Sequence, residues 1–414
     1  DLPADARMEY AASADEERYR LASRATNDAI WDWDLASDHI RWNEAVQTLF
    51  GYAPDGVGAS GAWWKSRIRP EDRDRLVYLM EGVEDLPYPV LTAGLPWDWE
   101  SFPDFLDALE RHPRAIDIAA QAAHLPLRVY VMGDRAIRRE VATPDDIAEM
   151  RRLTIEALRA GAFGFTTSRT DSHKTPDGEL VPSRFADADE LIGIGSALGA
   201  VGAGAFGMNS DFDDEAFELA WMRRVAKETG RPVWFLLTDR YEDPARWRRL
   251  LKAVHEARAE GLPLTAQIAG RPIGVMMGIG TALNPFTVRP GYRQIESLGL
   301  AEQRKRLRDP QVRRQILSEK PSEDEVAKLA QFRQLITSRW DKFFVMGNPP
   351  DYEPGPEKSV AAIAAREGRT PDEVAYDYIT EAEGQYLYFP VVNYVVGDHE
   401  PIREMMTDQA TLLG

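Results

Sequence analysis

Short apolar stretches alternate with amphipathic stretches along most of the chain. Short apolar stretches predict strands, and stretches with apolar residues every three or four positions predict helices. The predicted strands are residues 115–120, 161–168, 201–209, 232–238 and 263–270, and the predicted helices are residues 103–112, 142–161, 187–200, 213–230 and 243–261. This order is typical of βα units on a parallel sheet, and so many consecutive units favour a (β/α) barrel over a doubly wound sheet. No glycine-rich phosphate-binding motif follows any strand, which weakens a dinucleotide-binding interpretation.

The two ends of the chain carry other patterns. Trp31 and Trp33 alternate with Asp32 and Asp34, and a second strand begins at His39, so this part predicts a hairpin. Residues 284–345 form a polar insertion with helices. Beyond it we expect two short helices within residues 359–380, a strand at 386–394, a helix at 400–406 and the start of another strand at 411–414.

Composition narrows the class of protein. The 414 residues suffice for two or three domains, and 44% hydrophobic residues are ordinary for a globular protein. A net charge of −18 repels phosphate backbones, so we expect no nucleic-acid partner. No apolar run is long enough for a membrane span, so we expect no membrane partner. The absence of cysteine excludes disulfides and thiolate metal sites within this sequence, and we expect a cytoplasmic location.

Residues from about 15 to 75 resemble the first half of a PAS domain, a small α+β sensor. The resemblance rests on the motifs at residues 31–34, 40–43, 49–52, 63–64 and 68–73. It implies a partial sensor domain that binds a ligand or a partner protein, and it allows a homodimer through this part.

Residues from about 69 to 414 resemble the amidohydrolase superfamily, in its branch of N-acyl-D-amino-acid deacylases, which are D-aminoacylase-like proteins. The stretches that carry this resemblance include GLPWDWESFPDFLDALE, LRVYVMGDRA, GAFGFTTSRTDSHKTPDGELVPSRF, TAQIAGRPIG and NYVVGDHEPIREMM. Both families accept RPEDRDRL at residues 69–76, so the junction lies there.

The two resemblances together predict the fold class and the domains. We expect an α/β chain with an incomplete (β/α)8 TIM-type barrel at residues 77–414, interrupted by the helical insertion at 284–345, and a partial PAS-like domain at residues 1–76. Because barrel strands are expected to be missing at both ends, we expect an open, gapped barrel with weak margins.

The deacylase resemblance also implies chemistry. Such enzymes use zinc to activate a water molecule and an aspartate to move the proton. The family places a His-x-His pair on its first strand, a cysteine before the RPEDR stretch and the aspartate on its last strand. This chain has no His-x-His pair and no cysteine, and it ends where the aspartate motif would begin. We therefore expect no metal ligands and no catalytic residue, and a chain that is impaired or inactive as a hydrolase and binds no zinc.

Substrate-binding residues are expected at strand ends and in the loops that follow them. Ser168 ends one strand, and His173 lies in the next loop, where substrate contact and plain surface loop are about equally favoured. The resemblance matches His124 to a family histidine near a strand end, with a structural histidine whose hydrogen bonds are satisfied as the favoured alternative.

Two strand-end arginines are candidate carboxylate clamps, because a guanidinium pairs with both carboxylate oxygens. For Arg169 the alternative is a salt bridge to Asp171 or Asp177, and for Arg271 it is a structural ion pair. The acids Asp211, Asp213 and Asp214 could bind a hard cation, but capping of the next helix is favoured.

Three functions follow. The first is an impaired amidohydrolase-like hydrolase acting on carbon–nitrogen, non-peptide bonds, with a small-molecule N-acyl amino acid such as an N-acyl-D-amino acid as its partner. The alternative is a PAS-type sensory module fused to a non-catalytic barrel. The third is a chimeric fragment without an evolved function.

Overall fold

The described residues form two units, which are treated separately. The computed structural model describes residues 31–34, 39–42, 77–81, 83, 91, 95, 99–175, 177–281, 283–323, 326, 339–347, 349–382 and 384–414. The smaller unit contains one antiparallel pair of strands, β1 (Trp31–Asp34) and β2 (His39–Trp42), in which Trp31 pairs with Trp42. The hairpin expected at this place is confirmed.

The larger unit is built on a six-stranded parallel sheet with the strand order β11-β7-β6-β5-β4-β3. The strands are β3 (Gln121–Ala123), β4 (Gly164–Arg169), β5 (Ala205–Ser210), β6 (Val233–Leu236), β7 (Leu264–Ile268) and β11 (Thr411–Leu413). Arg169 at the end of β4 lies level with Ser210 at the end of β5. Consecutive strands therefore deliver their carboxyl ends to one edge of the sheet.

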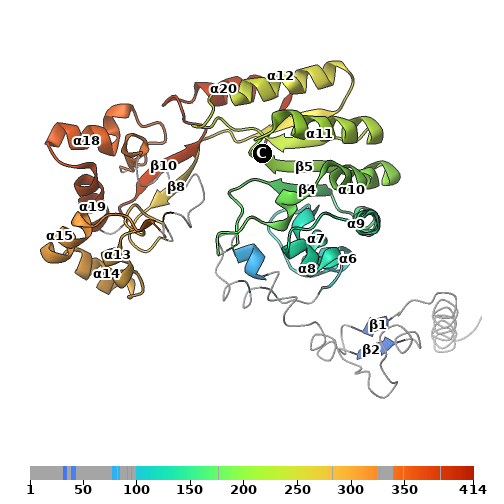
Figure 1. The fold of residues 1–414 in the computed structure, drawn as a ribbon, viewed down its shortest axis with the longest axis horizontal. Coiled ribbons are helices and arrows are strands. Elements are labelled where there is room, and N and C mark those ends of the chain that lie inside the picture. The colour runs from blue at the N-terminus through green and yellow to red at the C-terminus, as the bar shows by residue number, and fades with distance from the viewer. Residues whose placement is uncertain are drawn as a thin grey trace, which may run out of the picture. The chain divides into compact units, whose positions relative to one another are not determined.

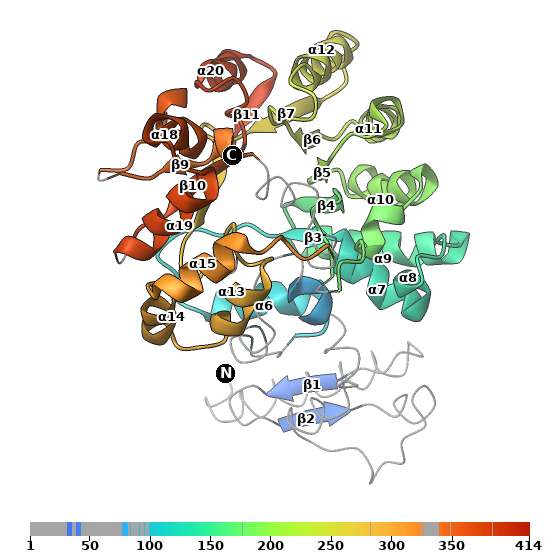
Figure 2. The same ribbon diagram turned by 60° about the vertical axis from the view of Figure 1, so that its left-hand side comes forward.

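Helices follow these strands on the same side of the sheet (Figures 1 and 2). They are α6 (Phe102–Arg111), α7 (His124–Met132), α8 (Asp134–Ile137), α9 (Pro144–Ala160), α10 (Ala188–Val201), α11 (Glu215–Thr229), α12 (Arg246–Ala259), α20 (Glu400–Thr407) and the 3-10 turn η2 (Pro182–Phe185). In the described part, none of the helices is both long and apolar enough to cross a bilayer.

Local signals explain where these helices begin and end. At the start of α9, the Thr143 side chain accepts a hydrogen bond from the Asp146 N–H, and the Asp146 carboxylate accepts one from the Thr143 N–H. Pro144 occupies the first turn of this helix. The helix ends at Gly161, whose φ of 117° is a left-handed conformation that glycine adopts without strain.

The two faces of the parallel sheet differ. Phe165, Phe206 and Phe235 are fully buried in the main core under the helices. Alternate residues of the same strands point the other way, and among them Thr166, Ser168 and Trp234 are only partly buried. On that face Trp234 lies so close to Gly207 that a Cβ there would come within 2.2 Å of the indole. A doubly wound sheet would carry helices on both faces, so this one-sided arrangement is that of a barrel-type sheet.

The residues between β7 and α20 form a second lobe. Its antiparallel sheet has the order β8-β10-β9, with β8 (Ile273–Met277), β9 (Phe344–Val345) and β10 (Leu387–Val392). Its helices are α13 (Pro290–Glu296), α14 (Leu300–Leu307), α15 (Pro310–Ser318), α18 (Val360–Glu367), α19 (Pro371–Glu381) and the 3-10 turns η4 (Trp340–Lys342) and η5 (Pro356–Lys358). A separate apolar core, with Phe343 stacked on Phe389 at 4.9 Å, holds this lobe together.

One expectation needs correction. Residues 115–120 form no strand; the strand is Gln121–Ala123, and Ile116 and Ile118 are 75% and 49% exposed. The strand β10, at the place where residues 386–394 predict a strand, pairs antiparallel with β8 and β9. The second lobe extends from β8 to β10 and so reaches beyond residues 284–345 on both sides.

The parallel sheet is open in the described part of the chain, where β3 and β11 are its outer strands. The PAS-like motifs beyond the hairpin, the junction at 69–76 and most of the insertion's second helix, residues 327–338, lie outside the described residues.

Candidate functional site

The carboxyl edge of the parallel sheet is the candidate site, because loops after parallel strands line the sites of α/β proteins. Each sequence-predicted binding residue lies there, directly after or at the end of β3, β4 or β7. Their side chains nevertheless point to different surroundings, and this decides which of them can meet a ligand.

Ser168 and His173 meet each other. The Ser168 hydroxyl lies 2.6 Å from His173 Nδ1, and both residues are partly exposed. The loop that carries His173 is a small hairpin closed by the bridge between Lys174 and Leu180. Ser168 belongs to the half-exposed face of β4, so this pair presents a hydroxyl and an imidazole at the carboxyl edge.

Arg169 points to the opposite face. Its Nε donates to Glu218 Oε1 at 2.7 Å and its Nη1 donates to the Ala186 carbonyl at 2.8 Å, while the side chains of Arg169 and Glu218 are both 5% exposed. Glu218 also accepts the indole N–H of Trp221. Neither Asp171 nor Asp177 is its partner. This guanidinium is engaged between β4 and α11 and does not face the open side of the sheet.

His124 is the first residue of α7 and is 1% exposed. Burial lowers the pKa of its imidazole, with Arg128 and Arg169 adding to this against the opposing effect of Glu190. The neutral ring donates from Nε2 to Glu190 at 2.9 Å and accepts at Nδ1 from the Thr167 hydroxyl at 2.8 Å. This geometry leaves neither ring nitrogen for a substrate.

Arg271 differs from Arg169 because it is exposed. Within the described part of the chain, its guanidinium forms one hydrogen bond, from Nη1 to the carbonyl of the neighbouring Pro272 at 3.3 Å. Among the described residues, no carboxylate forms an ion pair with it. It does face Tyr388, whose pKa burial raises to about 12, with Arg271 opposing the rise. A charged strand-end guanidinium with this freedom can receive a carboxylate.

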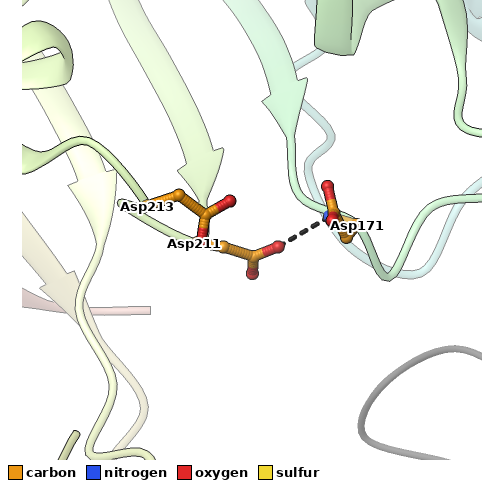
Figure 3. A group of neighbouring side chains, drawn as sticks. All are labelled: Asp171, Asp211 and Asp213. Atoms are coloured by element: carbon orange, nitrogen blue, oxygen red, sulfur yellow. Dashed lines mark hydrogen bonds between the residues drawn. The ribbon is translucent and has the colours of Figure 1, made fainter. Parts of the chain in front are cut away.

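Three carboxylates gather between the loops after β4 and β5 (Figure 3). Asp171, Asp211 and Asp213 each offer an oxygen within 4.8 Å of the others. Arg184 bridges two of them, with its Nε 2.9 Å from Asp171 and its Nη2 2.8 Å from Asp213, and Arg240 Nη1 donates to Asp211 at 2.6 Å. Two guanidinium groups therefore already neutralise the carboxylates that a metal cation would otherwise bind.

Asp211 ties three loops together. It accepts hydrogen bonds from the Thr170 hydroxyl at 2.9 Å and from the Asp171 N–H at 2.6 Å, besides Arg240. Burial alone would raise its pKa, but these donors and Arg240 outweigh burial and lower it. The capping role expected for this acidic run is confirmed for Asp214, which accepts the Phe217 N–H at the start of α11, and is wrong for Asp211 and Asp213.

The donor set of the described residues does not fit a zinc hydrolase centre. Zinc in proteins is bound by histidine nitrogen or cysteine sulfur with few carboxylates. In the described part, the one cluster of three potential metal ligands consists of Asp171, Asp211 and Asp213, and each of these carboxylates pairs with an arginine. His124 and His173 are engaged elsewhere and lie in no such cluster.

Sequence reasoning missed Asp239 and Asn393, which join the loop after β6 to the segment after β10. The Asp239 N–H donates to Asn393 Oδ1, and the Asn393 N–H donates to the Asp239 carbonyl, both at 2.8 Å. Asp239 is 1% exposed, and burial raises its pKa to about 6, with the Val395 N–H and Arg248 offsetting part of the rise. An acid placed directly after an apolar strand was the available signal; its partner, 154 residues away, had none.

The chain belongs to the amidohydrolase family, whose model matches residues 35–414. It is 31% identical over 148 residues to a D-aminoacylase of Alcaligenes xylosoxydans xylosoxydans, covering 36% of this chain and 28% of that protein. It is 35% identical over 121 residues to an N-acyl-D-aspartate deacylase of the same organism, covering 28% of this chain and 22% of that protein. The matched stretches are thus under a third of the curated relatives' lengths.

Two solved structures of D-aminoacylase, one of them a mutant in complex with copper chloride, are similar to 76% of this chain and 51% of their own, with 18% identity and a TM-score of 0.40. At this TM-score the likeness supports no conclusion about fold or site. The family model begins at residue 35, so it includes β2 and most of the stretch that resembles a PAS domain.

Proposed function

We propose that this chain binds N-acyl-D-amino acids at the carboxyl edge of its parallel sheet and acts, in impaired form, on their carbon–nitrogen amide bond. Membership of the amidohydrolase family supports the reaction class. The two curated relatives, a D-aminoacylase and an N-acyl-D-aspartate deacylase, support the substrate class.

The observation that carries the binding role is Arg271, a strand-end cation that is exposed and has no carboxylate partner in the described part. It would bind the substrate carboxylate through both oxygens. Ser168 and His173 would contact the amide or acyl group. Their strand β4 is three strand spacings from β7 in the sheet order, about 14 Å across a flat sheet. An arginine side chain and one N-acyl amino acid together can bridge this span.

We expect hydrolysis to be impaired, and the all-carboxylate composition of the cluster among the described residues supports this expectation, because zinc prefers histidine and cysteine ligands. In enzymes of this class the metal would activate water and polarise the carbonyl. Without it, Ser168, His173 and Arg271 supply binding and orientation, which alone leave most of the barrier to amide cleavage in place.

The test uses the purified chain and N-acetyl-D-methionine. Calorimetry should show binding of the D enantiomer in preference to the L enantiomer, weakened by about tenfold or more in Arg271→Met. Amine release should be slow and unchanged by added zinc. Absence of binding to the D enantiomer would refute the substrate class. Tightly bound zinc together with rapid amine release would refute the impairment.

The sensory alternative expects the β1–β2 hairpin, but the matched amidohydrolase model includes β2, and no comparison gives evidence for a PAS domain. Binding of a ligand by residues in this smaller unit, with no binding of N-acyl-D-amino acids, would favour it.

A further inference from the structure

Two chain segments connect the second lobe to the parallel sheet, and hydrogen bonds join these segments to each other, including one to Arg271. The chain leaves the parallel sheet through residues 269–272 and returns through residues 393–399, which we call the returning connection. These two segments join the lobe to the sheet. Asn393 lies on the returning connection, is fully buried and has a φ of 65°, a left-handed conformation.

Asn393 contacts both neighbouring strand ends. Its Oδ1 accepts the Asp239 N–H from the loop after β6 at 2.8 Å, and its Nδ2 donates to the Arg271 carbonyl after β7 at 3.4 Å. Its own N–H donates to the Asp239 carbonyl at 2.8 Å. One side chain thus links the loop after β6 to the backbone of Arg271.

Further bonds brace the same junction. The Tyr241 hydroxyl donates to the Pro390 carbonyl at 3.0 Å, and the Lys342 ammonium donates to the Val395 carbonyl at 3.1 Å and lies 5.1 Å from the centre of the Tyr241 ring. The Tyr241 hydroxyl also lies 3.4 Å from the Tyr394 carbonyl, so the loop after β6 contacts both β10 and the returning connection.

We propose that Asn393 and Asp239 form a clamp that positions Arg271 for a substrate carboxylate, and that ionisation of Asp239 loosens this clamp. The proposal rests on the proposed function, which assigns the carboxylate to Arg271. Asn393 acts through the backbone of Arg271 and touches no substrate, so it is a positioning residue.

The pH dependence has a geometric basis. The Asp239 carboxyl is buried, its Oδ2 accepts no hydrogen bond from any described residue, and the Val395 N–H is its one backbone donor. A buried carboxylate with an unpartnered oxygen favours opening of the structure around it. The charged and titratable groups around it are Arg248 on α12, Tyr241 on its own loop, and Lys342 and Arg339, which both lie against the Tyr241 ring. Burial raises the pKa of Asp239 to about 6, so the change falls near neutrality.

Asn393→Gly is the decisive variant, because glycine adopts the left-handed conformation without strain and removes only the side-chain bonds. Hydrogen exchange measured by mass spectrometry should show protection of the Asp239 and Val395 N–H groups reduced by about tenfold or more. Asn393→Ala, which adds backbone strain, is the matched comparison. Unchanged protection in Asn393→Gly with a large loss in Asn393→Ala would show a backbone effect and overturn the clamp.

The pH profile gives a second measurement. Affinity for N-acetyl-D-methionine in the whole chain should weaken by about fivefold or more from about pH 5 to about pH 7.5, and Asp239→Asn should flatten this profile. The substrate carboxylate and Arg271 keep their charges over this range. His173, another proposed binding residue, is unchanged in Asp239→Asn, so a profile that persists in this variant would overturn the role of Asp239.

The two proposals fail in different ways. Absence of wild-type binding refutes the proposed function and the carboxylate role of Arg271, while exchange of the Asp239 N–H in Asn393→Gly still decides whether the Asn393 side chain holds the loop after β6. Normal wild-type binding with an unchanged affinity in Asn393→Gly refutes the positioning role alone.

Discussion

Replacing each strand-end arginine by methionine separates a buried ion pair from a ligand-binding cation. Arg169 and Glu218 are both 5% exposed, and Arg169→Met leaves Glu218 buried with the Trp221 N–H as its remaining donor. Removing one partner of a buried ion pair costs about 3–5 kcal/mol. Arg271 is exposed and unpaired in the described part, so Arg271→Met should change stability by no more than about 0.5 kcal/mol.

A double variant tests whether the cost arises from the uncompensated charge. Arg169→Met with Glu218→Leu removes both charges and leaves the Trp221 N–H without its acceptor, at a cost of about 1–3 kcal/mol. It should therefore be more stable than Arg169→Met alone, because the buried carboxylate is gone.

Urea unfolding followed by tryptophan fluorescence measures these differences. With a denaturant slope of about 3 kcal/mol per molar, Arg169→Met should lower the unfolding midpoint by about 1 M or more. Arg271→Met should leave the midpoint in place and weaken binding of N-acetyl-D-methionine. The reverse pattern, an unchanged midpoint and lost binding in Arg169→Met, would show that Arg169 is the carboxylate clamp and that its contact with Glu218 is unimportant.

Three further predictions concern other buried groups. His124→Leu removes two hydrogen bonds and should cost about 1–3 kcal/mol in urea unfolding without altering substrate affinity, and lost affinity at unchanged stability would place His124 in the site. Asp211→Asn loses the ion pair with Arg240 and should lower the free energy of unfolding by about 1–3 kcal/mol. Asp213→Asn changes a side chain that is 59% exposed and should alter the free energy of unfolding by no more than about 0.5 kcal/mol. Equal losses of stability in the two variants would contradict the role of Asp211 in joining the three loops. Folding raises the pKa of Asp239 from 3.8 to about 6. The protonated carboxyl therefore contributes its full share of folding stability below about pH 4, and this contribution is lost as the pH rises through about 6. Asp239→Asn should thus be more stable than wild type at about pH 8, by at most about 3 kcal/mol in thermal unfolding, and a wild type whose stability does not fall between about pH 4 and pH 8 would contradict this.

Most of the parallel sheet was predictable because its signals are local. Helix α9 has its cap, its first-turn proline and its terminal glycine within one continuous stretch, and each of these acts on the neighbouring backbone. The sheet to which a strand belongs is not a local property. The apolar run at β10 is the same in a parallel and an antiparallel sheet, and its partner β8 lies more than a hundred residues earlier.

The pairing of Arg169 with Glu218 has a physical cause that the sequence did contain. Side chains alternate along a strand, so Arg169 shares a face with Phe165 and Thr167, while Ser168 points to the opposite face. Because Phe165 is fully buried under the helices, Arg169 had to enter the same side and needed a buried partner there. Position at a strand end indicates a binding residue only when the alternation also directs the side chain to the open face.

The place of the second lobe determines which strand end it can influence. An insertion between β7 and α20 leaves and re-enters the sheet at its carboxyl edge, beside Arg271, and both connections are held by Asn393. Ser168 and His173 lie on β4 and its loop, and they are braced instead by the Asp211 network, which involves no residue of the lobe. Motion of the lobe should therefore change the position of the carboxylate-binding group while leaving the hydroxyl–imidazole pair in place. Such a division would make affinity for the carboxylate, and not the contacts around Ser168, the quantity that depends on Asp239.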